Sequence, residues 1–461
     1  MSRPRVAVIG AGLTGLATAW RLRDDADVVV FDAAERVGGQ VRTIELADRP
    51  LDVGADALLA RQPEGEALVR ALGFGDDDLV APATGQVHLW TRGRLRPLPQ
   101  NTVMGVPTDL RALARSGVLT PLELARAAVE PLVPRRQLAG DRSVGDLIGE
   151  RFGSAVVERL VEPLLGGVYA GDTDRLSAEA ATATVWAAAQ RPQRSLTAAL
   201  RAHRADAPST DGPVFLTLRG GLTRLIDRLH SELGDRVRSA TPVRTVERST
   251  GGWRLHLDER VKVADAVVLA VPAPAAAALL AEPVPEVARE LAGIRMASVG
   301  VVALAYDPAD AVDAPQGSGL LVPRGEGRLI KAVTISSRKW PHHADGAAFV
   351  VRASVGRVDD VRALELDDDT LAERVDAEVR WALRLRGPAR ERTVVRWPRA
   401  LPQYDVGHRA RVDRVRFALE AMDARGLHIG GACFDGLGLS ARARDAQGLA
   451  QAVREDLARV S

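Results

Sequence analysis

The chain has 461 residues, of which 46% are hydrophobic and 26% charged, a composition typical of a globular protein with two or three domains. Its 62 basic and 60 acidic residues leave a formal charge of +2, which gives no case for nucleic acid as a bulk partner. A single cysteine, Cys433, excludes an intrachain disulfide and fits the cytoplasm, where we expect the protein. We also expect no signal peptide ahead of Arg5 and no transmembrane anchor, since no stretch of about 18 apolar residues occurs.

The first elements form a βαβ pattern. Residues 5–9 are a short apolar strand, residues 13–23 a helix, and residues 28–31 a second apolar strand. Asp32 ends the second strand about 20 residues beyond the first turn, where a carboxylate can accept hydrogen bonds from ribose hydroxyls. This order of elements is typical of a dinucleotide-binding unit.

Three glycines lie between the first strand and the helix with the spacing Gly10-x-Gly12-x-x-Gly15. Gly10 permits the tight turn, Gly12 lets the backbone approach a pyrophosphate, and Gly15 lets the helix pack closely on the strand. The helix N-terminus then offers unpaired N–H groups and a positive dipole to the phosphates. A chance glycine turn is the alternative, but the strand, the helix and the acidic residue all fall in place. The spacing alone does not separate FAD from NAD.

A double glycine follows in residues 35–43, Glu-Arg-Val-Gly-Gly-Gln-Val-Arg-Thr. Gly38 and Gly39 would let bare backbone pass beside the ribityl chain and the isoalloxazine ring. A surface turn also uses Gly-Gly, although not usually with these flanking residues. The segment resembles the second signature of the FAD-containing amine oxidases, desaturases and porphyrinogen oxidases.

Further along the chain, residues 108–204 are rich in Ala, Leu, Arg and Glu and predict several helices, broken near Pro131, Pro134 and Gly166-Gly167. Strands are predicted at 214–218, within 241–257 as a hairpin around Gly251-Gly252, and at 266–271, 299–305, 319–322, 330–335, 348–354 and 427–429. A closing helix is predicted at 441–459. Asp76, Asp77 and Asp78 are typical of a loop or a helix cap.

Residues 427–439 combine a strand, a glycine turn and a helix start, and resemble the C-terminal flavin motif of the same family. The helix N-terminus would face the flavin N1–C2=O edge, where negative charge develops on reduction. Porphyrinogen oxidases commonly continue with a Pro/Asn-Asp-Cys stretch, whereas residues 440–443 are Ser-Ala-Arg-Ala. Arg442 would either supply charge at that edge or be a solvated helix arginine.

Other segments resemble the protoporphyrinogen and coproporphyrinogen oxidases in particular. Residues 162–172 resemble their signature in the helical domain, residues 216–222 the loop returning to the flavin domain, and residues 51–56 the turn covering the flavin. Residues 339–341 and 397–408 match the same family. The resemblance spans essentially the whole chain and implies an FAD enzyme that oxidises a porphyrinogen.

The motifs and the resemblance together imply a set of FAD contacts. These are Gly10, Ala11, Gly12, Leu13, Thr14, Gly15, Asp32, Ala33, Gly38, Gly39, Gln40, Arg42, Gly54, Ala55, Asp56, Ala57, Val243, Trp397, Gly431, Leu437, Gly438 and Leu439. Val243 would use its backbone against the adenine, and Trp397 would either contact the flavin or be a core aromatic.

On the substrate side, the resemblance implies Gly166, Gly167 and Tyr169 in the pocket wall, where glycines would admit a flat macrocycle. Eukaryotic relatives often carry an arginine where this chain aligns Val87, so another basic residue must pair with the substrate propionates. The candidates are Arg96, Lys331, Arg338 and Lys339, although each alone is typical of a solvated surface charge.

Two smaller features predict no chemistry. His342-His343 lack the spacing and partners of a metal site, so we expect exposed loop histidines and no bound metal. Cys433 lies in the C-terminal flavin motif, where a packed structural thiol is favoured over a redox role.

We therefore expect an α/β fold in which a Rossmann-like FAD-binding domain is interleaved with a mixed-sheet substrate domain and a helical domain. The FAD-binding segments are 1–75, 213–290 and 405–461, the substrate-domain segments are 76–107 and 291–404, and the helical domain is 108–212.

The resemblance implies hydride transfer from a meso carbon to flavin N5, three such two-electron cycles per porphyrinogen, and reoxidation by molecular oxygen to hydrogen peroxide. No catalytic base is identified. The resemblance also allows transient contact with a ferrochelatase and peripheral contact with a membrane.

Coproporphyrinogen III is favoured over protoporphyrinogen IX because arginines interrupt the helical segment, which presents no apolar membrane face. The Arg- and Ala-rich composition also suggests a high-GC bacterium of the kind that makes haem through coproporphyrin. More distant alternatives are an amine oxidase or carotenoid desaturase, although 4% aromatics disfavours an aromatic amine cage, and an escort-type protein without flavin.

Overall fold

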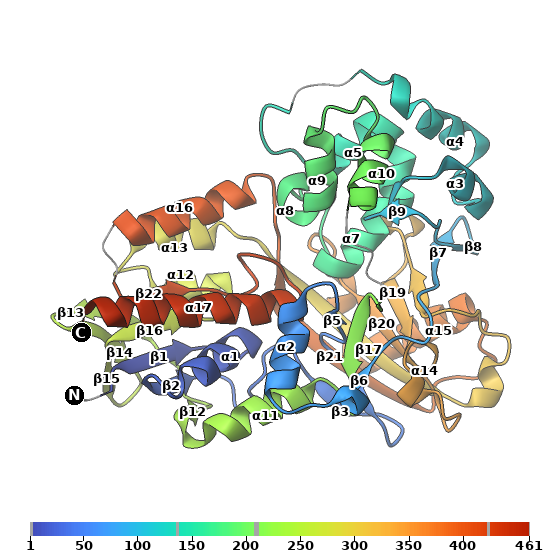
Figure 1. The fold of residues 1–461 in the computed structure, drawn as a ribbon. Helices are drawn as coiled ribbons and strands as arrows, with labels where there is room; N and C mark the ends of the chain where they lie inside the picture. The colour runs from blue at the N-terminus through green and yellow to red at the C-terminus, as the bar shows by residue number, and fades with distance from the viewer. Residues whose placement is uncertain (1–2, 135–137, 207–211, 422–424, 461) are drawn as a thin grey trace.

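The computed structural model describes residues 3–134, 138–206, 212–421 and 425–460. Figure 1 shows a parallel sheet with its helices on one side of the molecule, a mixed sheet on the other, and a helical unit above them. The ends of the expected domain segments that fall on residues 1–2, 207–211 and 461 lie outside the described residues.

The parallel sheet has the strand order β12-β2-β1-β16-β22. These strands are Val237–Arg238, Asp27–Phe31, Arg5–Ile9, Ala266–Leu269 and Leu427–Ile429, and each pairs in parallel with its neighbour. The apolar runs of β1 and β16 are buried, as central strands covered on both faces require. Helix α1 (Leu13–Leu22) joins β1 to β2, so the predicted βαβ opening is confirmed.

Helices cover one face of this sheet, and a small antiparallel sheet with further helices covers the other (Figure 1). The first face carries α1, α2 (Pro63–Ala71), α11 (Thr223–Leu233) and α17 (Leu439–Val460). The second carries β13 (Thr245–Ser249), β14 (Gly252–His256), β15 (Val261–Ala264), α12 (Ala273–Leu279), α13 (Pro285–Ala292) and α16 (His408–Ala421). The predicted hairpin at Gly251-Gly252 is confirmed as β13–β14.

The second sheet is mixed, in the order β21-β17-β20-β19-β18-β7-β8. Its strands are Glu391–Pro402, Met296–Tyr306, Phe349–Val355, Ile330–Ile335, Gly319–Leu321, Val87–Thr91 and Arg94–Pro97. Helix α15 (Asp368–Leu383) packs on one face and forms a hydrophobic core with it. The four predicted strands within 299–354 are confirmed with their ends shifted by a few residues, whereas β7, β8 and β21 were not predicted.

The helical unit contains the helices predicted within residues 108–204. They are α3 (Leu110–Ser116), α4 (Pro121–Ala128), α5 (Val144–Phe152), α6 (Ser154–Val156), α7 (Glu162–Tyr169), α8 (Ala178–Ala181), α9 (Ala183–Gln190) and α10 (Leu196–Asp206). The predicted break at Gly166-Gly167 is wrong: α7 runs through both glycines and ends one residue before Ala170, which has φ of 51°. Packing against neighbouring elements holds two weak helix formers in the helix, since propensity alone is a small term.

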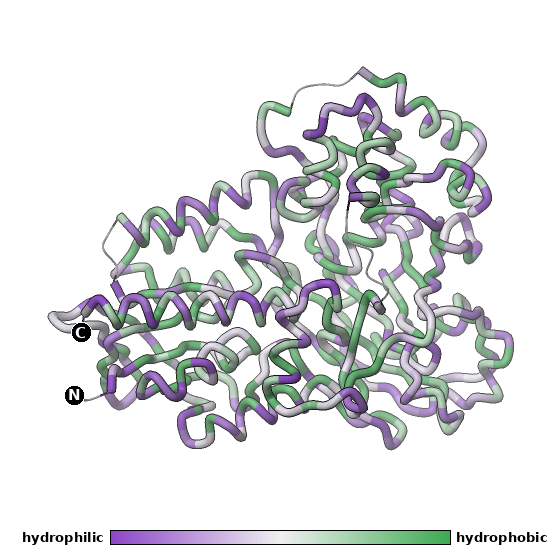
Figure 2. The backbone as a smooth tube through the Cα atoms, viewed as in Figure 1, coloured by the Kyte–Doolittle hydropathy of each residue, from purple (hydrophilic) through white to green (hydrophobic). Residues whose placement is uncertain are grey.

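Short elements complete the fold. The three-stranded sheet β5-β11-β6 consists of Leu58–Leu59, Phe215–Leu218 and Leu79–Val80, and the two hairpins are β3–β4 (Thr43–Glu45, Pro50–Asp52) and β9–β10 (Thr102–Val103, Val106–Pro107). Asp76–Asp78 form a 3₁₀ turn, and α14 (Ser336–Lys339) follows β19. Figure 2 shows hydrophobic residues concentrated in the strands, while outer helices such as α16 and α17 alternate in polarity. Over the described residues, every helix is too short or too polar to cross a bilayer.

Candidate flavin and substrate site

The carboxyl ends of β1, β16 and β22 meet at one edge of the parallel sheet and bring three distant loops together. A Cβ atom at Gly10 would lie 2.5 Å from the carbonyl oxygen of Ala270, and one at Gly15 would lie 1.9 Å from that of Gly10. Gly12 differs, because a Cβ there would meet no protein atom within 4 Å. Gly10 and Gly15 are therefore required by packing, whereas Gly12 presents bare backbone to open space.

The two N-terminal glycine motifs are in contact. The Gly38 N–H donates to the carbonyl oxygen of Ala11 at 2.8 Å, and Gly12 pairs with Gly38 in an isolated parallel bridge. The Arg36 guanidinium donates to the carbonyl of Val37 at 2.9 Å and to those of Val41 and Gly39, which holds the double glycine in this position. The segment is therefore part of the glycine-loop site and not an independent surface turn.

The Asp32 carboxylate accepts hydrogen bonds from the N–H groups of Ala11 at 2.6 Å and Ala34 at 2.8 Å, so it braces the glycine turn. The Thr241 N–H donates to the Asp32 carbonyl at 2.7 Å, which brings the loop that carries Val243 to this end of β2. Ala33 is exposed beside Asp32. These positions suit an adenosine, and the ribose contact of Asp32 stays a prediction.

Thr14, in the first turn of α1, provides a direct test of whether a phosphate fits. Its side chain is buried, yet its Oγ1 atom has no hydrogen-bond partner among the residues of the structure. A buried hydroxyl without a partner is costly unless a ligand satisfies it. Because the first N–H groups of a helix are also unpaired, Thr14 and the turn at Gly12 fit the pyrophosphate of a dinucleotide. Ala11 and Leu13, on either side of Gly12, are buried in the hydrophobic core beneath the turn.

At the C-terminal motif, α17 begins at Leu439, directly after Gly438, where a Cβ atom would again meet nothing within 4 Å. The buried Gly431 donates its N–H to Asp445 at 2.6 Å, and Leu437 packs against the helical core. This loop therefore presents a second helix N-terminus at the same edge of the sheet.

Arg442 lies in the first turn of α17, and of the two roles considered for it, the solvated helix arginine is wrong. The side chain is buried, donates to the carbonyl of Gly436 and lies 3.8 Å from Asp445. Its Nε and Nη1 atoms have no hydrogen-bond partner among the described residues. A buried guanidinium with free donors at a helix N-terminus fits an adjacent anionic group.

The turn at residues 54–57 joins the double-glycine segment to the mixed sheet. The Ala55 N–H donates to the Gln40 carbonyl at 3.1 Å, and the Val53 N–H donates to the Arg42 carbonyl at 2.9 Å. The indole of Trp397 donates to the Val53 carbonyl at 2.9 Å. Gln40 and Arg42 thus contribute backbone to this turn, and Ala57 is half-buried at its end.

Asp56 in this turn forms ion pairs with Lys339 at 2.8 Å and Arg352 at 3.2 Å. Although burial favours the neutral acid, these two cations lower the pKa of Asp56 to about 2. Lys339 is therefore a partly buried structural partner and not a solvated surface charge. Arg352 was missed, and the signal for it was a charged residue inside the otherwise apolar stretch 348–354.

One face of the mixed sheet is open near α7. Ala332, Thr334 and Ser354 lie on its central strands β19 and β20, yet each is only half-buried. On α7, Gly167 is exposed, Val168 is 48% exposed, and a Cβ at Gly167 would lie 3.7 Å from the Leu321 side chain on β18. The sheet residues Ala332, Thr334 and Ser354 and the helix residue Gly167 are small and partly exposed, so no bulky side chain at these positions would obstruct a flat ligand.

The wall of this region is linked to the C-terminal loop through Tyr169, at the end of α7. The rings of Tyr169 and Tyr404 lie 5.5 Å apart. The Tyr404 hydroxyl donates to the Ala432 carbonyl at 2.6 Å and accepts from the Gly436 N–H at 2.9 Å. The predicted substrate wall and the predicted flavin loop are therefore neighbours.

The remaining basic candidates for the propionate contact differ in their burial and in their partners. Lys331 is buried, so the surface-charge interpretation is wrong for it, because its strand is covered by α7. Arg338 is half-buried and donates to the Ala314 carbonyl at 2.8 Å, while Arg96 is half-buried beside Gly117. Val87 lies on β7, in the same sheet as Lys331.

The prediction of exposed histidines at 342 and 343 is also wrong. His343 is buried and His342 half-buried, with their rings 4.3 Å apart, because the turn Pro341–His343 packs beside Asp52, Asp56 and Arg352. Burial lowers the pKa of His343 to about 4. The structural role predicted for Cys433 is supported by its burial in the core, which raises the pKa of the thiol to about 11.

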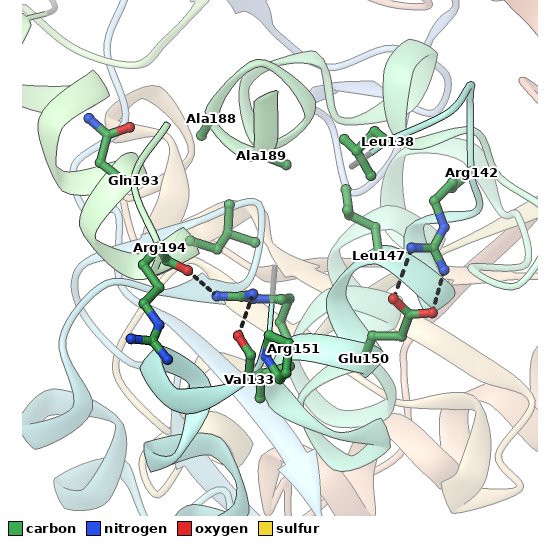
Figure 3. Close-up of a pocket in the computed structure, with 12 residues that line it drawn as sticks. Val133, Leu138, Arg142, Leu147, Glu150, Arg151, Ala188, Ala189, Gln193 and Arg194 are labelled. Carbon is green, nitrogen blue, oxygen red and sulfur yellow. Dashed lines mark hydrogen bonds and ion pairs between the residues drawn. The ribbon is translucent and has the colours of Figure 1, made fainter. Parts of the chain in front are cut away.

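Figure 3 shows a separate pocket of about 260 Å³ in the helical unit. Two of its arginines are already paired: Arg142 with Glu150 at 2.9 Å, and Arg151 with the Val133 carbonyl at 3.1 Å. Ligand pockets usually measure about 300–1,000 Å³. Its small volume and its place between α5, α9 and α10 argue against binding of a tetrapyrrole.

Known proteins are similar to this chain over nearly its whole length. Residues 13–436 match the family of flavin containing amine oxidoreductases. Coproporphyrinogen III oxidase of Mycobacterium tuberculosis is 37% identical over 440 residues, covering 94% of each chain, and that of Bacillus subtilis is 31% identical over 454 residues, covering 95% of each.

Solved structures agree. The crystal structure of a protein assigned as a protoporphyrinogen oxidase from Exiguobacterium sp. 255-15 has a TM-score of 0.87 at 31% identity, covering 99% of this chain and 100% of that one. Cyclohexylamine oxidase from Brevibacterium oxydans, at 19% identity and a TM-score of 0.71, covers 99% and 100% and shares the fold. The chain therefore belongs to the flavin containing amine oxidoreductases, in the porphyrinogen oxidase branch, as an FAD-dependent oxidoreductase.

Proposed function

We propose that the protein oxidises coproporphyrinogen III to coproporphyrin III, with three molecules of oxygen reduced to three of hydrogen peroxide. The observation that carries the proposal is the open, small-residue sheet face between α7 and the flavin loops, in a chain similar throughout to coproporphyrinogen III oxidases. The six hydrogens lost by the porphyrinogen equal those gained by three oxygen molecules, so the reaction balances.

The proposed FAD contacts follow the motifs. Thr14 and the N–H groups at Gly12 bind the pyrophosphate, and Asp32 with the loop of Val243 takes the adenosine. The double glycine, the turn 54–57 and Trp397 would contact the ribityl chain and ring. Bound FAD supplies two-electron redox chemistry.

Two groups of this chain would tune that chemistry. The N-terminus of α17 and the buried Arg442 would stabilise negative charge at the pyrimidine edge of the ring. The wall of Gly166, Gly167 and Tyr169 would orient the macrocycle and exclude water from it.

Protoporphyrinogen IX is the second candidate, because the similar Exiguobacterium structure is assigned to a protoporphyrinogen oxidase. It carries two vinyl groups where coproporphyrinogen III has propionates, so a preference depends on whether those two carboxylates find basic partners. One additional desolvated pair would favour coproporphyrinogen III by roughly tenfold or more in kcat/KM.

The test is anaerobic mixing of FAD-loaded protein with each porphyrinogen, followed at about 450 nm, where oxidised flavin absorbs. Aerobic reactions are then resolved chromatographically, with autoxidation blanks, and hydrogen peroxide is counted per porphyrin. Faster bleaching by coproporphyrinogen III and three peroxides per coproporphyrin support the proposal. Equal or reversed preference would assign protoporphyrinogen IX instead, and no bleaching by either would overturn the porphyrinogen oxidase activity.

We keep three wider expectations as part of this proposal: the domain boundaries given above, a cytoplasmic location, and transient contact with a ferrochelatase or peripheral contact with a membrane. Co-sedimentation with vesicles and pull-down of a ferrochelatase test the contacts.

A further inference from the structure

Three charged side chains are buried together where α7 meets the mixed sheet. Lys331 on β19 is 4% exposed, Arg357, two residues beyond the end of β20, is 3% exposed, and Glu162 at the start of α7 is 7% exposed. They come from the helical unit, from one strand of the sheet and from the turn that follows another. Charged residues are rarely buried this deeply unless they are paired.

The pairing in this cluster is incomplete. Glu162 accepts a hydrogen bond of 3.0 Å from the Arg324 N–H and lies 3.6 Å from the Arg357 Nε atom. Arg357 also donates to the Val322 carbonyl at 2.8 Å. The Lys331 ammonium forms no hydrogen bond or ion pair with any side chain in the described part of the chain. Lys331 and Arg357 are therefore buried beside Glu162, while Asp360 is a second carboxylate that acts on Arg357, and Lys331 has no ion-pair partner among the described residues.

The cluster borders the open face of the sheet. Lys331 lies at the irregularity in β19 between Ile330 and Ala332, and Ala332 is half-buried on the open face. Ala332 pairs across the sheet with Leu321, the side chain closest to a Cβ at Gly167. A ligand between Gly167 and this face would therefore lie one residue from Lys331.

Burial, and then the charge of Arg357, lowers the pKa of Lys331 to about 7, with Glu162 acting in the opposite direction. Burial also lowers the pKa of Arg357 and raises that of Glu162, while Arg324 acts on both from the turn Arg324–Glu326. Arg357 and Glu162 are thus the charged groups that act on Lys331, and Arg324 and Asp360 act in turn on Arg357. An incoming carboxylate would favour the ammonium form, because opposite charges stabilise each other strongly in a desolvated site.

We propose that Lys331 and Arg357 form a buried carboxylate subsite for one propionate of the tetrapyrrole, and that Lys331 takes up a proton when that propionate binds. This rests on the proposed function, which supplies the tetrapyrrole as ligand. The propionate would provide the counterion that Glu162 alone does not supply, and it would fix the rotation of the macrocycle in its slot.

The experiment is calorimetric binding of coproporphyrin III to the FAD-loaded protein at pH 8, in two buffers of different ionisation enthalpy. We expect uptake of up to one proton per porphyrin, since Lys331 is mostly neutral at that pH before binding. Lys331→Met should abolish the uptake and weaken binding about tenfold or more, the loss expected for one charge-assisted bond. Lys331→Arg should restore affinity without proton uptake, because arginine is already charged.

The matched control is Lys262→Met, on the exposed strand β15, which should leave both affinity and proton uptake unchanged. The subsite would be overturned if the native protein binds coproporphyrin III without taking up a proton. It would also be overturned if Lys331→Arg takes up as many protons as the native protein. If Lys331→Met fails to bind FAD, Lys331→Arg and the native protein still decide the question. The porphyrinogen assay tests the proposed function independently of the calorimetry. If the protein turns over porphyrinogen but binds porphyrin without proton uptake, the subsite is rejected and the proposed function is not.

Discussion

Arg352 on β20 donates a hydrogen bond of 2.8 Å to the carbonyl oxygen of Gly54, in the turn that follows the second glycine segment. The same guanidinium forms an ion pair with Asp56, two residues further along that turn. Arg352, on the mixed sheet, therefore fixes the position of a turn that we propose to contact the flavin. The glycine loops at the edge of the parallel sheet and this turn thus depend on different sheets.

Arg352→Met should release that turn. Asp56 would keep only Lys339 as a partner, and the loss of one charge-assisted contact and of the hydrogen bond to Gly54 should lower the free energy of unfolding by about 1–3 kcal/mol. We expect a lower melting temperature and weaker FAD retention during gel filtration. Arg396→Met on β21, whose guanidinium pairs with the exposed Asp368, is the control and should retain FAD. Equal flavin content in the two variants would show that Arg352 does not position the turn.

Gly12→Ala and Gly15→Ala should fail in different ways. Gly12 has φ of −72° and open space at its Cβ, so the alanine should leave the apoprotein stable and obstruct only the cofactor phosphates. At Gly15 a Cβ would lie 1.9 Å from the Gly10 carbonyl oxygen, so the apoprotein itself should be destabilised. Denaturant unfolding of the apoproteins and FAD titration separate the two effects. A Gly12 variant that binds FAD normally would place the phosphates elsewhere.

Thr14→Val and Thr18→Val are a matched pair on α1. The buried Thr14 hydroxyl lacks a protein partner, whereas Thr18 donates to the Thr14 carbonyl at 2.8 Å within the helix. We expect Thr14→Val to weaken FAD binding about tenfold, the value of about 1.4 kcal/mol for a lost hydrogen bond, and Thr18→Val to leave the Kd unchanged. Flavin fluorescence quenching measures both. Identical dissociation constants would mean that Thr14 does not contact the cofactor.

Gly167→Leu should raise KM or abolish turnover while the flavin spectrum stays normal, because the side chain would project toward the open sheet face near Leu321. Gly448→Leu is the control: it is also an exposed helical glycine, on α17, with no atom within 4 Å of its Cβ position. Steady-state kinetics with coproporphyrinogen III decide the matter. A Gly167→Leu variant as active as Gly448→Leu contradicts the proposed wall.

Asp52→Asn should stabilise the protein at neutral pH. Burial raises the pKa of Asp52 to about 6, although hydrogen bonds from Thr43 and the Leu222 N–H act against the shift. A carboxyl whose folded pKa exceeds the unfolded value of 3.8 makes folding less favourable as pH rises from about 4 to 6, by up to about 3 kcal/mol. The variant should therefore have a higher melting temperature than the native protein above pH 6, and the same melting temperature below pH 4. A gain independent of pH would rule out ionisation of Asp52 as the cause.

The sequence alone determined the features that depend on local spacing. The interval from Gly10 to Gly15 between an apolar strand and a helix predicted the glycine turn, the helix start and the buried parallel strand correctly. Such patterns are informative because a tight turn, a close helix–strand contact and a covered strand each restrict the residues at fixed positions. The unpredicted β21 carries Pro398 and several charged residues, so no alternation revealed it.

Only the tertiary structure decided which charged groups are buried and what they face. Lys331, His343 and Arg442 are typical of surface residues in the sequence, yet α7, the turn at Asp56 and the C-terminal loop cover them. Arg352 meets Gly54 from a strand 298 residues away. Burial and pairing are properties of segments that fold against one another, and the pKa of a side chain depends on that environment, which local periodicity does not encode.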